Sequence, residues 1–277
     1  MKSKYFIFTL LFLFFLVIET PAHAKREFMT GVNYAHIHRG NSGYGSTKSL
    51  DQKRRLINAN VNWIAITPFA YQKTVLSPDI AFNNDRSMTD ANVIKEIEDA
   101  HELGMKVAIK PHVWSSDFWS GDEWHGTIRQ TSSQDHKKWW KGYRNYVLHF
   151  AHLAADYDVE LYIIGTELVE MTRLYPDEWR ALIRDIRKFY KGQLSYAAHW
   201  NNEPHQIKFW DDLDFIGVGV YFPMNLPDGA TTKELIQAWT PYRNAMSDFS
   251  KKHGKDIAFL EVGYRRADGV WRSPWEY

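Results

Sequence analysis

Short apolar runs alternate along this chain with longer amphipathic stretches. The apolar runs cover residues 28–35, 63–69, 106–112, 161–165, 194–199, 215–221 and 257–262, and each is short enough to be a buried strand. The amphipathic stretches predict helices over 48–60, 89–103, 134–157, 176–190 and 232–253, with a short one near 204–210. Such regular alternation is typical of β–α units that build a parallel sheet.

Several residues mark where these helices begin and end. Thr89 or Asp90 can cap the second helix, and Leu103 followed by Gly104 ends it. Pro176 suits the first turn of a helix. No linker, low-complexity tract or short repeat interrupts the alternation, so we expect a single domain.

Two α/β architectures fit this pattern, a doubly wound open sheet and a TIM (β/α)8-type barrel. A nucleotide-binding open sheet carries a Gly-rich turn after its first strand, whereas here residues 31–34 lead into His36, Arg39 and Gly40. We therefore favour the barrel. After the seventh run only 263–277 remain, too few for another helix, an eighth strand and its helix. We expect a barrel truncated after strand 7, with strand 8 missing, because the sequence is a fragment or because the barrel is open.

Residues 1–24 have the pattern of a secretory signal peptide. Lys2 and Lys4 precede an apolar run at 6–18, and the small residues Ala22 and Ala24 suit signal peptidase. The run is shorter than the roughly 20 apolar residues that a membrane-spanning helix needs. We expect residues 25–277 to form a secreted or periplasmic domain with no membrane contact after cleavage. An uncleaved anchor is the alternative.

Composition excludes several classes of protein. The chain has no cysteine, which rules out thiolate catalysis and thiolate metal sites. The formal net charge is +1 with both signs interspersed, so we do not expect nucleic acid as a partner. Aromatic residues make up 16% of the chain, including 12 Trp. Flat rings with polar edges complement the apolar face of a sugar, although core packing accounts for most individual Trp residues.

Catalytic groups of a TIM barrel lie at the C-terminal ends of its strands. Two strand ends carry a carboxylate, Glu167 after the fourth run and Glu261 in the seventh. Burial at a strand end raises the pKa of a carboxyl group unless a cation or hydrogen bonds compensate. Two facing carboxylates in different environments supply an acid and a nucleophile about 5 to 5.5 Å apart, as retaining glycoside cleavage requires. Each glutamate alone could equally be a salt-bridged strand end.

Both strand ends resemble those of glycoside hydrolase family 113, whose members are β-mannanase-like. The likeness lies in Ile164-Gly165-Thr166-Glu167 and Phe259-Leu260-Glu261-Val262-Gly263-Tyr264, and extends to residues 31–34, 66–69, 110–114 and 219–223. The resemblance implies a catalytic domain over 25–277 that cleaves a β-1,4-linked polysaccharide, β-mannan above all, by double displacement. It assigns Glu167 as acid/base and Glu261 as nucleophile, with no metal or cofactor. Thr166 departs from the wider superfamily, in which Asn often precedes the acid/base.

Other strand-end side chains are candidates to bind the substrate. Tyr221 could hydrogen-bond the nucleophile and hold its orientation. The others are Asn33, His112, Trp114, His199, Trp200 and Tyr264. Any of these could belong to the core instead. We expect a monomer whose partner is a polysaccharide or oligosaccharide.

Two other functions stay open at this point. His36 and His38 at the end of the first strand, with His112, His199 or His205, could bind zinc in a metal-dependent hydrolase. That interpretation gives the two glutamates no role. Alternatively, the chain is a sugar-binding barrel that has lost turnover.

Overall fold

The computed structural model describes residues 28–36, 42–83 and 88–276. The signal peptide predicted for residues 1–24, and His38 of the alternative metal motif, lie outside these ranges. Within them, no helix is both long and apolar enough to cross a membrane.

One curled sheet of parallel strands forms the centre of the molecule, in the order β1-β2-β4-β6-β7-β8-β9. The strands are β1 (Gly31–Ala35), β2 (Trp63–Thr67), β4 (Lys106–Ile109), β6 (Leu161–Thr166), β7 (Gln193–Ala198), β8 (Ile216–Gly219) and β9 (Ile257–Glu261). Each predicted apolar run overlaps one of them, and β6 and β7 each extend one residue beyond the predicted run. Strands that are consecutive in this sheet are also consecutive along the chain, as in a TIM barrel. The predicted fold class is confirmed.

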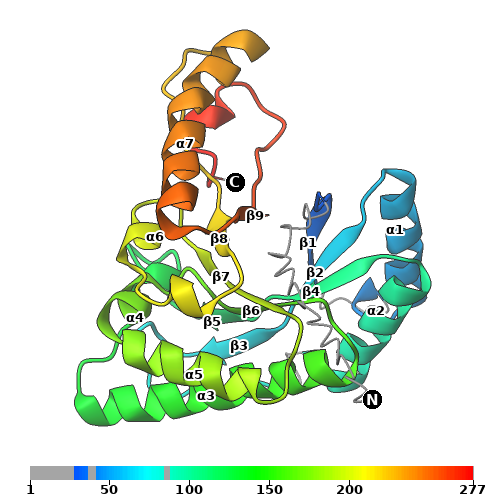
Figure 1. Cartoon of the computed structure of the whole chain (residues 1–277), viewed down its shortest axis with the longest axis vertical. Coiled ribbons are helices and arrows are strands. Elements are labelled where there is room, and N and C mark those ends of the chain that lie inside the picture. The colour runs from blue at the N-terminus through cyan, green and yellow to red at the C-terminus, as the bar shows by residue number, and fades with distance from the viewer. Residues whose placement is uncertain (1–27, 37–41, 84–87, 277) are drawn as a thin grey trace, which may run out of the picture.

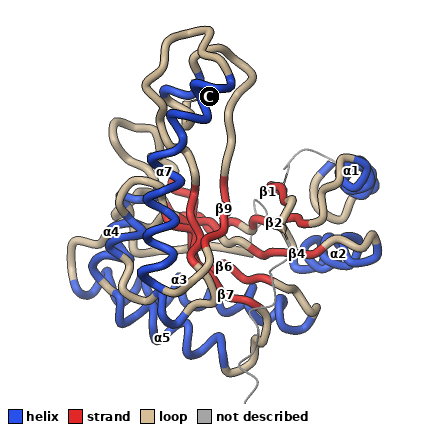
Figure 2. The backbone as a smooth tube through the Cα atoms, turned by 45° about the horizontal axis from the view of Figure 1, so that its top comes forward, coloured by secondary structure: helices blue, strands red, loops and turns tan. Residues whose placement is uncertain are grey.

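Helices occupy the connections between the strands. They are α1 (Thr47–Asn58), α2 (Asp90–Glu102), α3 (Ser133–Asp156), α4 (Val169–Leu174), α5 (Pro176–Arg187), α6 (Glu203–Gln206) and α7 (Thr232–His253), with the 3-10 helices η2 (His125–Thr127), η3 (Trp210–Asp212) and η4 (Val270–Arg272). Helices α1 and α2 lie beside β1, β2 and β4, while α3, α5 and α7 cover the other strands (Figure 1). Figure 2 shows the strands at the centre, with the helices outside them. The sequence did not predict the short helix α4.

The predicted helix ends agree with the structure. Thr89 is the N-cap of α2, and its hydroxyl accepts a hydrogen bond from the backbone N–H of Asn92 in a capping box. Gly104, which follows the last turn of α2, has a positive φ of 74° that an L side chain rarely adopts. Pro176 occupies the first turn of α5.

Two of the predicted strands are interrupted by a proline, so their predicted boundaries were wrong. The runs at 63–69 and 106–112 were expected to be single strands, but β3 (Phe69–Gln72) and β5 (His112–Ser115) pair in a separate two-stranded parallel sheet. Pro68 and Pro111 stand at the two breaks. Proline has no N–H to donate, so the main ladder cannot continue through it. The break leaves Lys110 between the two sheets.

The packing of α3 and α5 against β6 fixes the strand that leads to Glu167. Tyr143 of α3 and Trp179 of α5 are fully buried, and the Tyr143 hydroxyl donates a hydrogen bond to Ile164 O at 2.8 Å. Only glycine fits at position 165, because a Cβ there would lie 2.5 Å from Tyr143 Oη and 2.8 Å from the Trp179 ring. This close approach holds the end of β6 in place.

Strands β1 and β9 are the two edges of the curled sheet. Their residues are exposed or half-exposed, and none is buried. The side chain of Asn33 on β1 donates a hydrogen bond to Leu260 O on β9 at 3.1 Å, so the curl brings the two edges within reach of one side chain. Between β9 and residue 276 the described chain contains η4 and no further strand.

Candidate active site

Glu167 and Glu261 meet at the C-terminal end of the sheet. Glu167 directly follows β6, Glu261 ends β9, and Gly219 ends β8 between them. A Cβ placed on Gly219 would lie 3.0 Å from Glu167 Oε1 and 3.9 Å from Glu261 Cβ. The missing side chain of Gly219 therefore leaves the space that the two glutamates share.

The backbone of Glu167 adopts a conformation that is uncommon for an L residue. Its φ is +50°, in the left-handed region. Two hydrogen bonds tie this turn to β7: Glu167 N–H donates to Ala197 O at 2.9 Å, and Leu168 N–H donates to Tyr196 Oη at 2.6 Å. Strained backbone persists only where the surroundings over-determine it, and it is concentrated at functional sites.

The environment of Glu167 favours its protonated form. Burial raises the pKa of this carboxyl well above its usual range, and the negative charges of Glu261 and Glu203 raise it further. Lys110 opposes the shift without cancelling it. At neutral pH Glu167 can therefore donate a proton.

The environment of Glu261 favours its ionised form. Lys110 Nζ lies 2.5 Å from Glu261 Oε1, and the Tyr221 hydroxyl donates a hydrogen bond to Oε2 at 3.2 Å. Burial alone would raise the pKa of Glu261, but the charge of Lys110 and these hydrogen bonds outweigh it and lower the pKa to about 2. The contact with Tyr221 is the one expected from the sequence.

Lys110 was not among the predicted site residues, although it stands at a strand end. Its side chain is only 1% exposed. A buried cation needs a buried partner, and Glu261 supplies one. The sequence did carry a signal for this site residue: Lys110 follows an apolar strand and directly precedes Pro111.

Two neutral histidines lie beside this ion pair. Burial and the nearby charge of Lys110 lower the pKa of His112 to about 3, and burial lowers that of His125 to about 4. His112 Nε2 lies 3.8 Å from Glu261 Oε1, and this buried nitrogen makes no hydrogen bond in the described structure. His112, a predicted site residue, is thus close to the carboxylate and free to bond a ligand. His125 of η2 was not predicted.

Aromatic rings form a wall beyond β7. The His199 ring lies 4.6 Å from Trp124 and 5.3 Å from Trp200, and Trp200 stacks on Trp275 at 5.5 Å. His199 and Trp200 are half-buried, and burial lowers the pKa of His199 to about 4. Both were predicted from the sequence, whereas Trp124 and Trp275 were not.

Three other predicted residues lie at the margin of this site. Trp114 is 38% exposed and packs edge-on against Phe118 at 5.3 Å. Tyr264 is also 38% exposed, and the side chain of Asn33 bonds the β9 backbone. No hydrogen bond in the described structure joins any of the three to Glu167 or Glu261.

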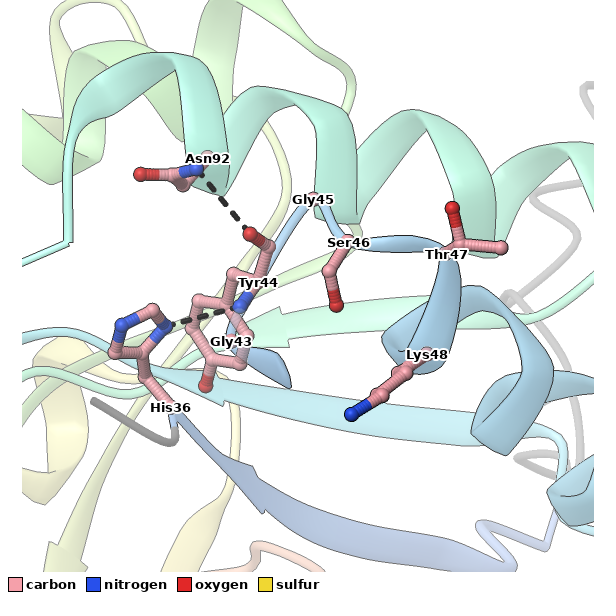
Figure 3. A pocket seen from close by; sticks show the side chains of 8 residues that line it. All are labelled: His36, Gly43, Tyr44, Gly45, Ser46, Thr47, Lys48 and Asn92. Atoms are coloured by element: carbon pink, nitrogen blue, oxygen red, sulfur yellow. Dashed lines mark hydrogen bonds between the residues drawn. The ribbon is translucent and has the colours of Figure 1, made fainter. Parts of the chain in front are cut away.

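The described histidines of the alternative metal site do not form a cluster. His36 Nδ1 accepts a hydrogen bond from Tyr44 N–H at 3.0 Å and lines a separate pocket at the start of α1 (Figure 3). His205 packs against Phe249 of α7. Among the described residues, no three His, Cys, Asp or Glu side chains are grouped as a metal site requires.

Comparisons with known proteins agree with the fold described above. A solved complex of a family 113 β-1,4-mannanase shares 26% identity with this chain at a TM-score of 0.76, over 90% of this chain and 76% of that one. The β-mannanase AaManA from Alicyclobacillus acidocaldarius, solved with ManMIm, shares 25% identity at a TM-score of 0.78, over 91% and 76%. A β-glucuronidase from Ruminococcus gnavus is similar in fold alone, with 13% identity and a TM-score of 0.56 over 86% and 36%. No curated protein matches the chain.

A curled sheet of parallel β–α units with glutamates at two of its strand ends is the arrangement of a barrel-type glycosidase. The model of Glycoside Hydrolase Family 113 matches residues 33–277. The chain therefore belongs to glycoside hydrolase family 113.

Proposed function

We propose that this chain is a retaining glycosidase that cleaves β-1,4-linked mannan by double displacement. The observation that carries the proposal is the contrast between the two facing carboxyl groups. Their environments raise the pKa of Glu167 and lower that of Glu261. One site thus holds a proton donor beside an ionised nucleophile, as retaining hydrolysis requires.

In the first step, Glu167 protonates the glycosidic oxygen while Glu261 attacks the anomeric carbon. The bond from that carbon to the leaving oxygen breaks, and an ester bond to Glu261 forms. The hydrogen bond from Tyr221 fixes one oxygen of Glu261. Lys110 keeps the carboxylate ionised before attack.

In the second step, ionised Glu167 removes a proton from water, and the water oxygen displaces Glu261 from the anomeric carbon. Esterification removes the negative charge of Glu261, which is one cause of the raised pKa of Glu167. That pKa therefore falls once the intermediate forms. The acid of the first step becomes the base of the second.

Mannan is proposed as the substrate because the family 113 structures that are similar over most of this chain are β-mannanases. The aromatic wall of His199, Trp200 and Trp275 supports a carbohydrate ligand, since flat rings complement the apolar face of a pyranose. Mannose and glucose differ at one hydroxyl, so a panel of polymers has to decide between them.

The test is product release from β-mannan, glucomannan, cellulose and xylan. We expect new reducing ends from mannan, and loss of activity in both Glu167→Gln and Glu261→Gln. A protein that binds mannan tightly but releases no product would instead be a sugar-binding barrel. Full activity in either variant would refute the site assignment.

We also propose that residues 1–24 direct export and are removed. The basic residues, apolar run and small residues at the start of the chain support this. Expression of the full sequence, followed by N-terminal sequencing of the exported protein, should find Lys25 first. Retention of Met1 on a membrane-bound product would contradict this proposal.

A further inference from the structure

A third glutamate, Glu203, lies behind the acid/base. It opens α6 after β7, and its side chain is completely buried. No cation in the described part of the chain forms an ion pair with it. Only uncharged hydrogen-bond donors contact its carboxylate in the described structure. A buried carboxylate without a cation is costly, so its surroundings must provide hydrogen bonds.

Three donors surround the Glu203 carboxylate. Thr172 Oγ1 of α4 and Tyr196 Oη of β7 donate to Oε1 at 2.9 and 2.8 Å, and His199 N–H donates to Oε2 at 2.6 Å. Thr172 and Tyr196 are themselves fully buried. Burial raises the pKa of Glu203 to about 7, against the opposing effect of these three hydrogen bonds, so its charge is present on the alkaline side of neutrality. The titratable groups that face Glu203 are Tyr196 and, through its charge, Glu167.

One arm of this network reaches the acid/base. Tyr196 Oη donates to Glu203 and accepts the hydrogen bond of Leu168 N–H at 2.6 Å. Leu168 directly follows Glu167, whose φ of +50° needs support from outside. Because Glu203 fixes the Tyr196 hydroxyl, it also fixes the acceptor that holds the Glu167 turn.

The other arm reaches the aromatic wall. Glu203 Oε2 accepts the hydrogen bond of the His199 backbone N–H. The His199 ring lies against Trp124 and Trp200. One buried carboxylate therefore connects the acid/base turn after β6 with the proposed sugar-binding residues after β7.

Resting on the proposed function, we infer that Glu203 is a positioning residue that holds the Glu167 turn and the His199 backbone in their active geometry. It acts through Tyr196 and does not touch the reacting atoms. A carboxylate is needed because all three contacts are donors, and a Gln amide would present N–H groups to one of them. When ionised, Glu203 also favours the protonated form of Glu167 through its charge.

The test compares wild type with Glu203→Gln on two β-mannosides. The leaving group of mannotetraose is poor and needs the proton of Glu167. The dinitrophenolate of dinitrophenyl β-mannobioside departs without a proton. We expect kcat/KM for mannotetraose to fall about tenfold and that for the aryl substrate to change less than about twofold. The alkaline limb of the pH profile should move to lower pH. The reason is that the Gln side chain carries no negative charge to raise the pKa of Glu167.

Two further variants separate position from charge. Tyr196→Phe cuts the link to Leu168 but keeps the charge of Glu203, so it should reproduce the selective loss on mannotetraose without moving the alkaline limb downward. Glu170→Gln is the matched control, because Glu170 is partly exposed and pairs with Arg173 at 2.6 Å. We expect its kinetics to equal those of wild type.

Equal losses on both substrates in Glu203→Gln would overturn the inference while wild-type turnover upholds the proposed function, and an unmoved alkaline limb would refute the effect of its charge. If wild type cleaves no mannoside, the proposed function fails. Carbon NMR titration of the Glu167 carboxyl in both proteins then still decides the matter. A lower pKa in Glu203→Gln supports the role of Glu203, and an equal pKa refutes it.

Discussion

Lys110 Nζ lies 2.5 Å from Glu261 Oε1, although β6, β7 and β8 separate the strands from which the two residues come. The curl of the sheet brings them together across its interior. Because Lys110 is 1% exposed and Glu261 19% exposed, water screens their attraction little. The pair therefore acts mainly on the ionisation of Glu261.

Replacing Lys110 by Met should reduce kcat/KM about a hundredfold, because an ionised nucleophile would lose the cation that stabilises it. The carboxyl of Glu261 is active when ionised, and Lys110 lowers its pKa. Without Lys110 that pKa rises, so the acidic limb of the pH profile should move to higher pH. A pH series of initial rates measures both effects.

Lys106→Met is the matched control for Lys110→Met. Lys106 begins β4, at the end of the sheet opposite the site, where substitutions affect stability more than chemistry. We expect its pH profile to match that of wild type. An acidic limb that stays fixed in Lys110→Met, or moves equally in both variants, would contradict the role of the ion pair.

Tyr221→Phe should lower kcat about tenfold and leave the fold intact. The change removes one hydroxyl that donates to Glu261 Oε2 at 3.2 Å, and a hydrogen bond to a charged group contributes about 1.5–3 kcal/mol. Steady-state kinetics with a thermal melt measure this. Tyr264→Phe is the control, since Tyr264 is 38% exposed and makes no hydrogen bond to Glu261 in the described structure. Similar kinetics in the two variants would argue against a role for Tyr221.

Gly165→Ala should destabilise the protein by about 2 kcal/mol, since a single added methyl group overpacks a dense core. The new Cβ would lie 2.5 Å from Tyr143 Oη. Gly142→Ala in α3 is the matched control, because its Cβ would lie 3.4 Å from Ile80 and alanine favours a helix by about 0.5–1 kcal/mol. Urea unfolding compares them. Equal stability in the two variants would show that β6 is not tightly packed.

Trp200→Ala should raise KM for mannan about fivefold and change kcat less, because an aromatic contact contributes about 0.5–1.5 kcal/mol. Trp200 stacks on Trp275 and lies 5.3 Å from the His199 ring. Kinetics on soluble mannan test this. A fall in kcat at unchanged KM would place Trp200 in the chemistry rather than in substrate binding.

The strand order and the meeting of the two glutamates could be predicted because both follow from local patterns. Apolar runs mark strands, and parallel strands bring their C-terminal ends to one side. The breaks at Pro68 and Pro111 were also local and were overlooked. Helix α4 has only six residues, too few for a clear periodic signal.

Glu203 could not be found from the sequence. Its donors come from α4, from β7 and from the turn after β7, so its role exists only once these elements pack together. Lys110 was visible at a strand end, but its partner lies 151 residues away. Contacts of this kind depend on the curl of the sheet, which no local pattern specifies.

The central claim is that Glu261 is the nucleophile and Glu167 the acid/base, and azide rescue tests it most directly. Alanine variants of each glutamate would be incubated with dinitrophenyl β-mannobioside and sodium azide, and the configuration of the mannosyl azide determined by NMR. Azide takes the place of the missing group. We predict the α-azide from Glu261→Ala and the β-azide from Glu167→Ala. The reverse configurations, or full hydrolysis by either variant without azide, would contradict the account.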